Sequence, residues 1–234
     1  MLRHKSFLTI MVLIAFVSMI ASACASPTPI PETASSQTAA PPLPTEVPAT
    51  PAPVTFIFGN QGEPVCLDPG IMSDGVTARV TNQIFEGLVK YEKDTTKVIP
   101  GLAESWEASA DGTVWTFHLR TGVKFHDGTD FDATAVVKNF DYWKNPDNPL
   151  HAAQEAAGKS FLHYPLEFGG FGDDSIITKV EALDSSTVQF TLKRPQGPFL
   201  QNLAIFSYVF WSPTALEAAG VDSCKNPVGT GPFR

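Results

Sequence analysis

The uneven distribution of proline is the feature that most constrains how this 234-residue chain can fold. Nine of its twenty prolines fall within residues 25–53, among serine, threonine and alanine and only two charged side chains, Glu32 and Glu46. A segment of this composition cannot bury enough apolar surface to offset the entropy lost on ordering. We therefore predict that residues 25–53 form a disordered linker and that residues 54–234 form the folded domain.

The first 24 residues have the order of an export signal. Arg3 and Lys5 supply positive charge, an uncharged apolar run extends from Phe7 to Ile20, and small residues precede Cys24. This order is typical of a secretory signal, and the run is too short to span a membrane comfortably. It resembles a bacterial lipoprotein signal, which implies that Cys24 is acylated and becomes the membrane anchor. The alternative is ordinary cleavage after small residues, with Cys24 incidental.

Charge and cysteine content exclude two classes of protein. The chain has 16 Lys and Arg against 24 Asp and Glu, and the whole net charge of −8 lies within residues 54–234. No basic cluster offsets this charge, so we expect no nucleic-acid partner. Three cysteines are too few for a small scaffold held by disulfides, and 181 residues suffice to bury a large core.

Alternating apolar residues predict four strands in the folded domain. Asp111–Gly112 is a hairpin-turn signal before the second strand, and a turn at Asp184 joins the last two strands. The predicted strands are residues 54–58, 115–119, 176–183 and 187–192.

Three amphipathic helices are predicted among these strands. The first has apolar side chains every four residues from Val76 to Leu88. The predicted caps are Ser73 or Asp74 for the first helix, Asp132 for the second, and Ser212 with Pro213 for the third, which Gly220 ends. The mixture predicts an α/β (mixed α+β) fold.

The search for catalytic motifs is negative. The chain has no Gly-x-Ser-x-Gly, His-Glu-x-x-His, Walker or Cys-x-x-Cys motif. The glycine-rich stretches 169–172 and 229–231 are predicted turns, and Asp173–Asp174 is a predicted loop. The four histidines of the domain lack metal-ligand spacing and are predicted to be solvated or hydrogen-bonded: His118, His126, His151 and His163. We expect neither an enzyme nor a metal or other cofactor.

Five motifs in order along the domain carry a resemblance to a known family. They are residues 102–106, 109–113, 115–120, 122–128 and 226–233. Together they resemble the family 5 extracellular solute-binding proteins, the receptors of ABC importers for oligopeptides, dipeptides and nickel. Residues 145–151 and 188–195 look most like the dipeptide-binding branch.

The resemblance implies the first lobe of a two-lobed periplasmic-binding-protein-like fold, whose closure traps a ligand for a membrane permease. The family pattern continues beyond Arg234, so we expect the second lobe to be missing, together with the carboxylate that holds a ligand's amino terminus in the dipeptide branch. One lobe offers half a cleft, so residues 54–234 alone are expected to bind ligand weakly or not at all. The implied receptor is an exported monomer, anchored in the membrane and facing the periplasm or the cell surface.

One stretch of this chain matches a ligand-facing segment of the family, namely Met72, Ser73 and Asp74. Exposed amides and short polar side chains at a helix N-terminus suit ligand binding. The alternative is that Ser73 or Asp74 only caps the helix, and Asp74 argues against a carboxylate ligand at that spot.

The two cysteines of the domain, Cys66 and Cys224, are predicted to form a disulfide, because leftover cysteines in an exported domain favour pairing. The alternative is two free buried thiols.

Three functions follow from these observations. The leading hypothesis is a lipid-anchored receptor that delivers peptides, or a similar small solute, to an ABC permease. The second is an anchored sensor or scavenging receptor without import. The third is an extracellular hydrolase, which the missing motifs oppose. The preference for peptide over nickel rests on analogy, since one fold hosts many ligands.

Overall fold

The structure, a computed structural model, describes Thr55 and residues 57–234. The predicted signal at residues 1–24 with Cys24, the predicted linker at residues 25–53, and two residues of the first predicted strand lie outside the described residues. The elements in chain order are α2 (Gly75–Ile84), β1 (Val89–Tyr91), β2 (Val98–Pro100), β3 (Ala103–Ala108), β4 (Val114–Leu119), α3 (Ala133–Lys144), α4 (Pro149–Ala156), α5 (His163–Phe168), η1 (Gly172–Asp174), β5 (Ile177–Asp184), β6 (Thr187–Leu192), α6 (Phe199–Leu203), α7 (Pro213–Ala219) and η2 (Gly220–Asp222).

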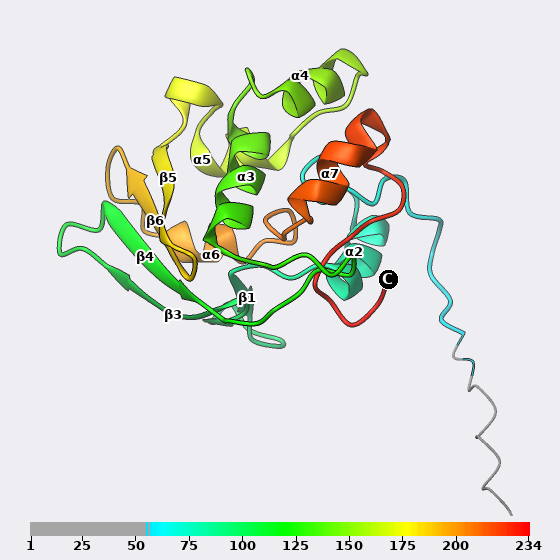
Figure 1. Cartoon of the computed structure of the whole chain (residues 1–234), viewed down its shortest axis with the longest axis horizontal. Helices are drawn as coiled ribbons and strands as arrows, with labels where there is room; N and C mark the ends of the chain where they lie inside the picture. The colour runs from blue at the N-terminus through cyan, green and yellow to red at the C-terminus, as the bar shows by residue number, and fades with distance from the viewer. Residues whose placement is uncertain (1–54, 56) are drawn as a thin grey trace, which may run out of the picture. The chain divides into compact units, whose positions relative to one another are not determined.

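A four-stranded antiparallel sheet in the order β3-β4-β6-β5 is the main layer of the domain. Its register places Trp115 opposite Phe190 and Phe117 opposite Val188, so that one face collects the large apolar side chains. Helix α3 lies against this face, beside β5 and β6 (Figure 1). A separate two-stranded sheet pairs β1 with β2.

The predicted helix caps are confirmed. Asp132 accepts a hydrogen bond from the amide of Ala135 at 2.8 Å and begins α3. Ser212 begins α7 with a proline at its first turn, and Gly220 follows its last residue.

The strands 115–119, 176–183 and 187–192 are confirmed within a residue or two as β4, β5 and β6. These elements agree because each depends on a local signal, a cap or a turn.

The first predicted strand is wrong where the structure describes it. Ile57 and Phe58 are in no strand, and their exposed fractions are 87% and 70%. A short apolar run forms a strand only when a neighbouring strand completes its hydrogen bonds. The first helix is also shorter than predicted, since its apolar stripe predicts a helix that continues to Leu88 and the helix ends at Ile84. Leu88 is buried beyond that end, where its carbonyl accepts a hydrogen bond from the amide of Gly101.

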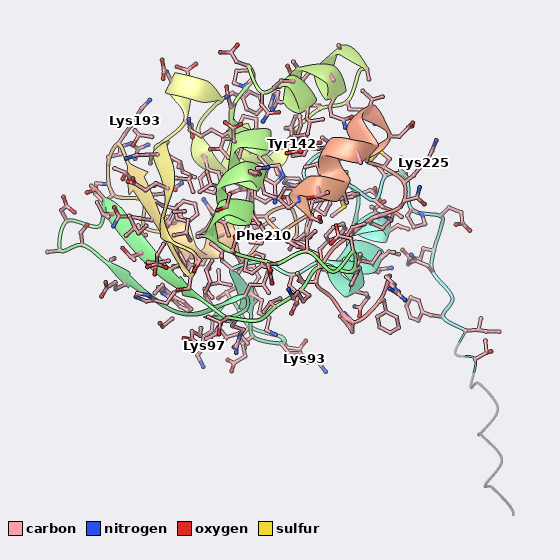
Figure 2. The ribbon with its side chains drawn as sticks, in the orientation of Figure 1. Lys93, Lys97, Tyr142, Lys193, Phe210 and Lys225 are labelled. Carbon is pink, nitrogen blue, oxygen red and sulfur yellow. A yellow bond between two sulfur atoms is a disulfide. The ribbon has the colours of Figure 1, made fainter. Side chains whose placement is uncertain are left out.

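Aromatic side chains form the centre of the core. Phe140 of α3 meets Phe190 of β6 edge to face, with ring centroids 4.8 Å apart, and Trp143 at 5.0 Å. Its ring also lies within 6.5 Å of Tyr208 and Phe210. Each such pair contributes about 0.5–1.5 kcal/mol beyond the burial of area. Figure 2 shows Phe210 within the body of the domain, whereas the labelled lysines lie at its edge: Lys93, Lys97, Lys193 and Lys225.

Among the residues that the structure describes, no helix has both the length and the apolar character that a membrane span requires.

We predict that Phe140→Ala lowers the free energy of unfolding by about 3–5 kcal/mol, because it leaves a cavity where α3 meets the sheet. Urea denaturation followed by circular dichroism measures the change. Leu166→Ala is the control, since this side chain is 69% exposed and its loss should change stability by less than about 0.5 kcal/mol. Equal effects of the two substitutions would contradict the assigned core.

Candidate functional site

The stretch from Met72 to Asp74 lies at the N-terminus of α2. The Asp74 carboxylate accepts a hydrogen bond from the Thr77 amide at 2.8 Å, and this bond, with one from the Thr77 hydroxyl, holds the pKa of Asp74 below its usual range. Met72 is buried, and its sulfur lies 3.9 Å from the hydroxyl of Thr81. Asp74 is therefore occupied as a cap and Met72 packs inward, so that Ser73 is the exposed side chain of the three.

Ser73 borders a hollow of about 470 Å³. Two exposed apolar side chains, Val65 and Leu162, border the same hollow. The rest of its lining is Cys66, Ile71, Gly158, Lys159, Ser160 and Cys224. An apolar surface with two hydroxyl groups and the ammonium group of Lys159 suits a small organic ligand better than a metal ion.

A disulfide between Cys66 and Cys224 lines this hollow. The amide of Leu67 donates to the carbonyl of Cys224 at 3.1 Å beside it. The two bonds join the loop before α2 to the segment that follows η2. The hollow is thus formed by chain segments whose bridged cysteines are 158 residues apart in sequence.

A buried carboxylate, Asp68, lies between the disulfide and the segment 72–74. It is 0% exposed, and it accepts hydrogen bonds from the Tyr142 hydroxyl at 2.7 Å and the Gly70 amide at 3.0 Å. Burial raises the pKa of Asp68 above its usual range, although hydrogen bonds from Ser223 and Tyr142 oppose the shift. Burial and the charge of Asp68 also raise the pKa of Tyr142, so its hydroxyl keeps the proton that it donates.

A larger cleft of about 770 Å³ lies between β1, α5 and the segment after α6. It combines two carboxylates, Glu86 and Glu167, with the rings of Tyr91, His163 and Phe206. The hydroxyl of Thr230 donates to Glu86 at 2.9 Å. None of Met72, Ser73 and Asp74 lines this cleft.

The structure brings some of the predicted site residues together and separates others. Ser73, Cys66 and Cys224 border one hollow, whereas the side chains of Met72 and Asp74 do not. Two of the histidines have separate partners: His126 contacts the Gly231 carbonyl and His151 the Tyr142 carbonyl. The Nε2 atom of His163 is buried without a hydrogen-bond partner among the described residues. Within the described part of the chain, no three His, Cys, Asp or Glu side chains gather where they could hold a metal ion.

The buried role of Asp68 is not predicted from the sequence. This residue lies in an irregular loop between two prolines, where an aspartate is ordinarily a turn residue exposed to water. Its burial arises from Tyr142, Gly70 and Ser223, which the chain brings together only in the folded state. The only local signal was its place two residues after Cys66.

Comparison with known proteins gives one matching family. Residues 97–234 match the model of the family described as bacterial extracellular solute-binding proteins, family 5 Middle. The dipeptide-binding protein of Escherichia coli is 38% identical over 192 residues, which cover 77% of this chain and 35% of that protein.

Solved structures show the same fold. The dipeptide-binding protein of Pseudoalteromonas sp. SM9913 in complex with Met-Leu is 30% identical, with a TM-score of 0.64, over 74% of this chain and 35% of that chain. NikZ of Campylobacter jejuni in complex with Ni(L-His) is 29% identical, with a TM-score of 0.58, over 75% of this chain and 31% of that chain. The chain therefore spans about a third of the length of these relatives.

We predict that neither Cys66 nor Cys224 reacts with a thiol label under native, non-reducing conditions, and that both react after reduction and unfolding. Reduction should lower the free energy of unfolding by up to about 5 kcal/mol, because the bridge closes a loop of 158 residues in the unfolded chain. Mass spectrometry of the labelled protein measures the first effect and urea denaturation the second. Two labelled sites before reduction would exclude the bridge.

We also predict that, relative to Asp68→Asn, the native protein gains stability as the pH falls from 7 into the carboxyl range. A carboxyl with a raised folded-state pKa binds its proton more tightly when folded. The contribution of Asp68 to the free energy of unfolding is therefore fully present below its pKa in the unfolded chain. It is lost as the pH rises through its pKa in the folded protein.

Urea unfolding at a series of pH values measures this difference. For Asp111→Asn, the stability difference from the native protein should change with pH in the opposite direction. Hydrogen bonds from Ser109 and Thr113 lower the pKa of Asp111, so its contribution is present above the unfolded pKa and is lost as pH falls through the folded pKa. If the stability difference between native protein and variant changes with pH in the same direction for both variants, the raised pKa of Asp68 is refuted.

Proposed function

Because the chain belongs to the family 5 bacterial extracellular solute-binding proteins, we propose that it forms the first lobe of a receptor that captures a peptide, or a similar small solute, and delivers it to the permease of an ABC importer. The single observation that carries the proposal is the 38% identity with a dipeptide-binding protein over three quarters of this chain. Identity at this level extends well beyond the glycine-rich motif of residues 229–231.

Export and anchoring are part of the same proposal. The basic start of the chain, the apolar run to Ile20 and the small residues before Cys24 support a lipoprotein signal. The proline-rich residues 25–53 would then separate the anchored Cys24 from the folded domain. This placement gives the receptor access to solutes outside the cytoplasm while it stays close to its permease.

We propose that the hollow beside Ser73 is the part of this lobe that faces the ligand. Support comes from its exposed apolar side chains, Val65 and Leu162, which a ligand and an opposing lobe would cover together. Ligand contacts on both lobes favour the closed state, so binding shifts the population toward closure. The acidic Asp74 at the adjacent helix end disfavours a ligand carboxylate beside Ser73, whereas Lys159 in the lining of the hollow can attract one.

We predict that the receptor expressed from its complete gene binds Met-Leu, and that Ser73→Trp weakens this binding by more than about tenfold because the indole fills the hollow. Isothermal titration calorimetry measures both affinities, and residues 54–234 alone should give weak binding or none. The matched control is Ser185→Trp, an exposed serine on the turn between β5 and β6 that does not line the hollow.

Ni(L-His) is the competing probe. Binding of Ni(L-His) without binding of Met-Leu would contradict the peptide proposal and retain the receptor. Equal losses of Met-Leu affinity in Ser73→Trp and Ser185→Trp would contradict the location of the ligand face. Hydrolysis of Met-Leu by the purified receptor would contradict the assignment as a binding protein.

A further inference from the structure

We propose that Asp68 is a positioning residue that fixes the backbone up to Met72 and thereby places Ser73 at the ligand face. The inference rests on the proposed function for the identity of that face, and on the structure for the contacts that hold it. The Asp68 cluster, as we define it, consists of Asp68, Tyr142, Gln154 and Ser223.

Asp68 holds its own loop by accepting hydrogen bonds from three backbone amides. Its carboxylate accepts the Gly70 amide at 3.0 Å, and its backbone carbonyl accepts the amides of Ile71 at 3.3 Å and Met72 at 3.1 Å. One residue therefore determines the direction of the chain through the three positions that precede Ser73. Gly70 is packed directly on α3, since a Cβ there would lie 2.7 Å from the indole nitrogen of Trp143.

The rest of the cluster fixes Asp68 to two other parts of the fold. Tyr142 of α3 donates its hydroxyl to the carboxylate at 2.7 Å. Gln154 of α4 donates to the Ser223 hydroxyl at 2.8 Å and to the Gly220 carbonyl at 2.8 Å. Figure 2 shows Tyr142 inside the domain, on the part of α3 near α7. The loop before α2 is thus held to α3, α4 and η2 through side chains without access to water.

Stability alone does not account for a buried carboxylate at this position. Removing a charge from water is expensive, and apolar replacements of buried ionic groups are often neutral or stabilising. A carboxylate can accept several hydrogen bonds at once in a fixed geometry, which an apolar side chain cannot do. The cluster therefore lowers the stability of the fold but fixes the conformation of the loop beside the hollow that Ser73 borders.

The test compares Tyr142→Phe with Tyr164→Phe in the ligand-free chain. Both substitutions delete one buried hydroxyl, but Tyr164 pairs with Ser175 at 3.0 Å, away from the Asp68 loop. Native-state hydrogen exchange should become about tenfold faster at the amides of Gly70, Ile71 and Met72 in Tyr142→Phe, because a hydrogen bond to a charged group is lost. In Tyr164→Phe these amides should exchange as in the native chain.

Unchanged exchange at these amides in Tyr142→Phe, or an equal increase throughout the sheet, would overturn the proposal. Should Tyr142→Phe fail to fold, Ser223→Ala removes another donor to the same carboxylate and serves the same comparison.

A second readout uses the receptor from the complete gene. Tyr142→Phe should weaken Met-Leu binding by about tenfold, and Tyr164→Phe should not weaken it. Equal affinities of the native receptor and Tyr142→Phe would overturn the positioning role. A native receptor that binds no Met-Leu, together with the expected exchange contrast, would instead refute the peptide proposal and retain the fixed loop.

Discussion

Helix α3 organises the domain because its aromatic side chains make contacts in two directions. Phe140 packs edge to face on Phe190 of β6 and holds the helix on the sheet. Two residues further, Tyr142 donates its hydroxyl to Asp68 and holds the loop before α2 on the same helix. Residues two apart on a helix do not face the same side, so one helix can serve the core and the loop independently. The place of Ser73 therefore depends on how α3 packs on the sheet.

The surroundings of Ser73 combine rigid and exposed parts. The backbone before α2 is held by the disulfide between Cys66 and Cys224 and by the buried Asp68. Val65 and Leu162, in contrast, leave apolar surface exposed to water. Exposed apolar surface beside a rigid, hydrogen-bonded loop is typical of a surface that another molecule covers. In a two-lobed receptor that cover consists of the ligand and the opposing lobe, and a preformed wall reduces the ordering cost of binding.

Local signals explain which parts of this structure could be predicted from sequence. Asp132 and Ser212 each satisfy a helix amide by themselves, and the turn at Asp184 joins neighbouring strands, so these elements were found correctly. The strand predicted at residues 54–58 failed because a strand depends on a partner elsewhere in the chain. The burial of Asp68 could not be predicted for the same reason, since it requires Tyr142, which is 74 residues away in sequence. The family motifs indicated the receptor class, and the tertiary contacts then showed how Ser73 is held.

The most direct test of this account is hydrogen exchange in the complete receptor, with and without saturating Met-Leu. We expect slower exchange at residues 73–76 and 158–162 when Met-Leu is bound, because both segments border or adjoin the hollow beside Ser73. Protection confined to residues 85–91 and 204–209 would place the ligand in the larger cleft and contradict the account. Exchange unaffected by Met-Leu anywhere in residues 57–234 would contradict it as well.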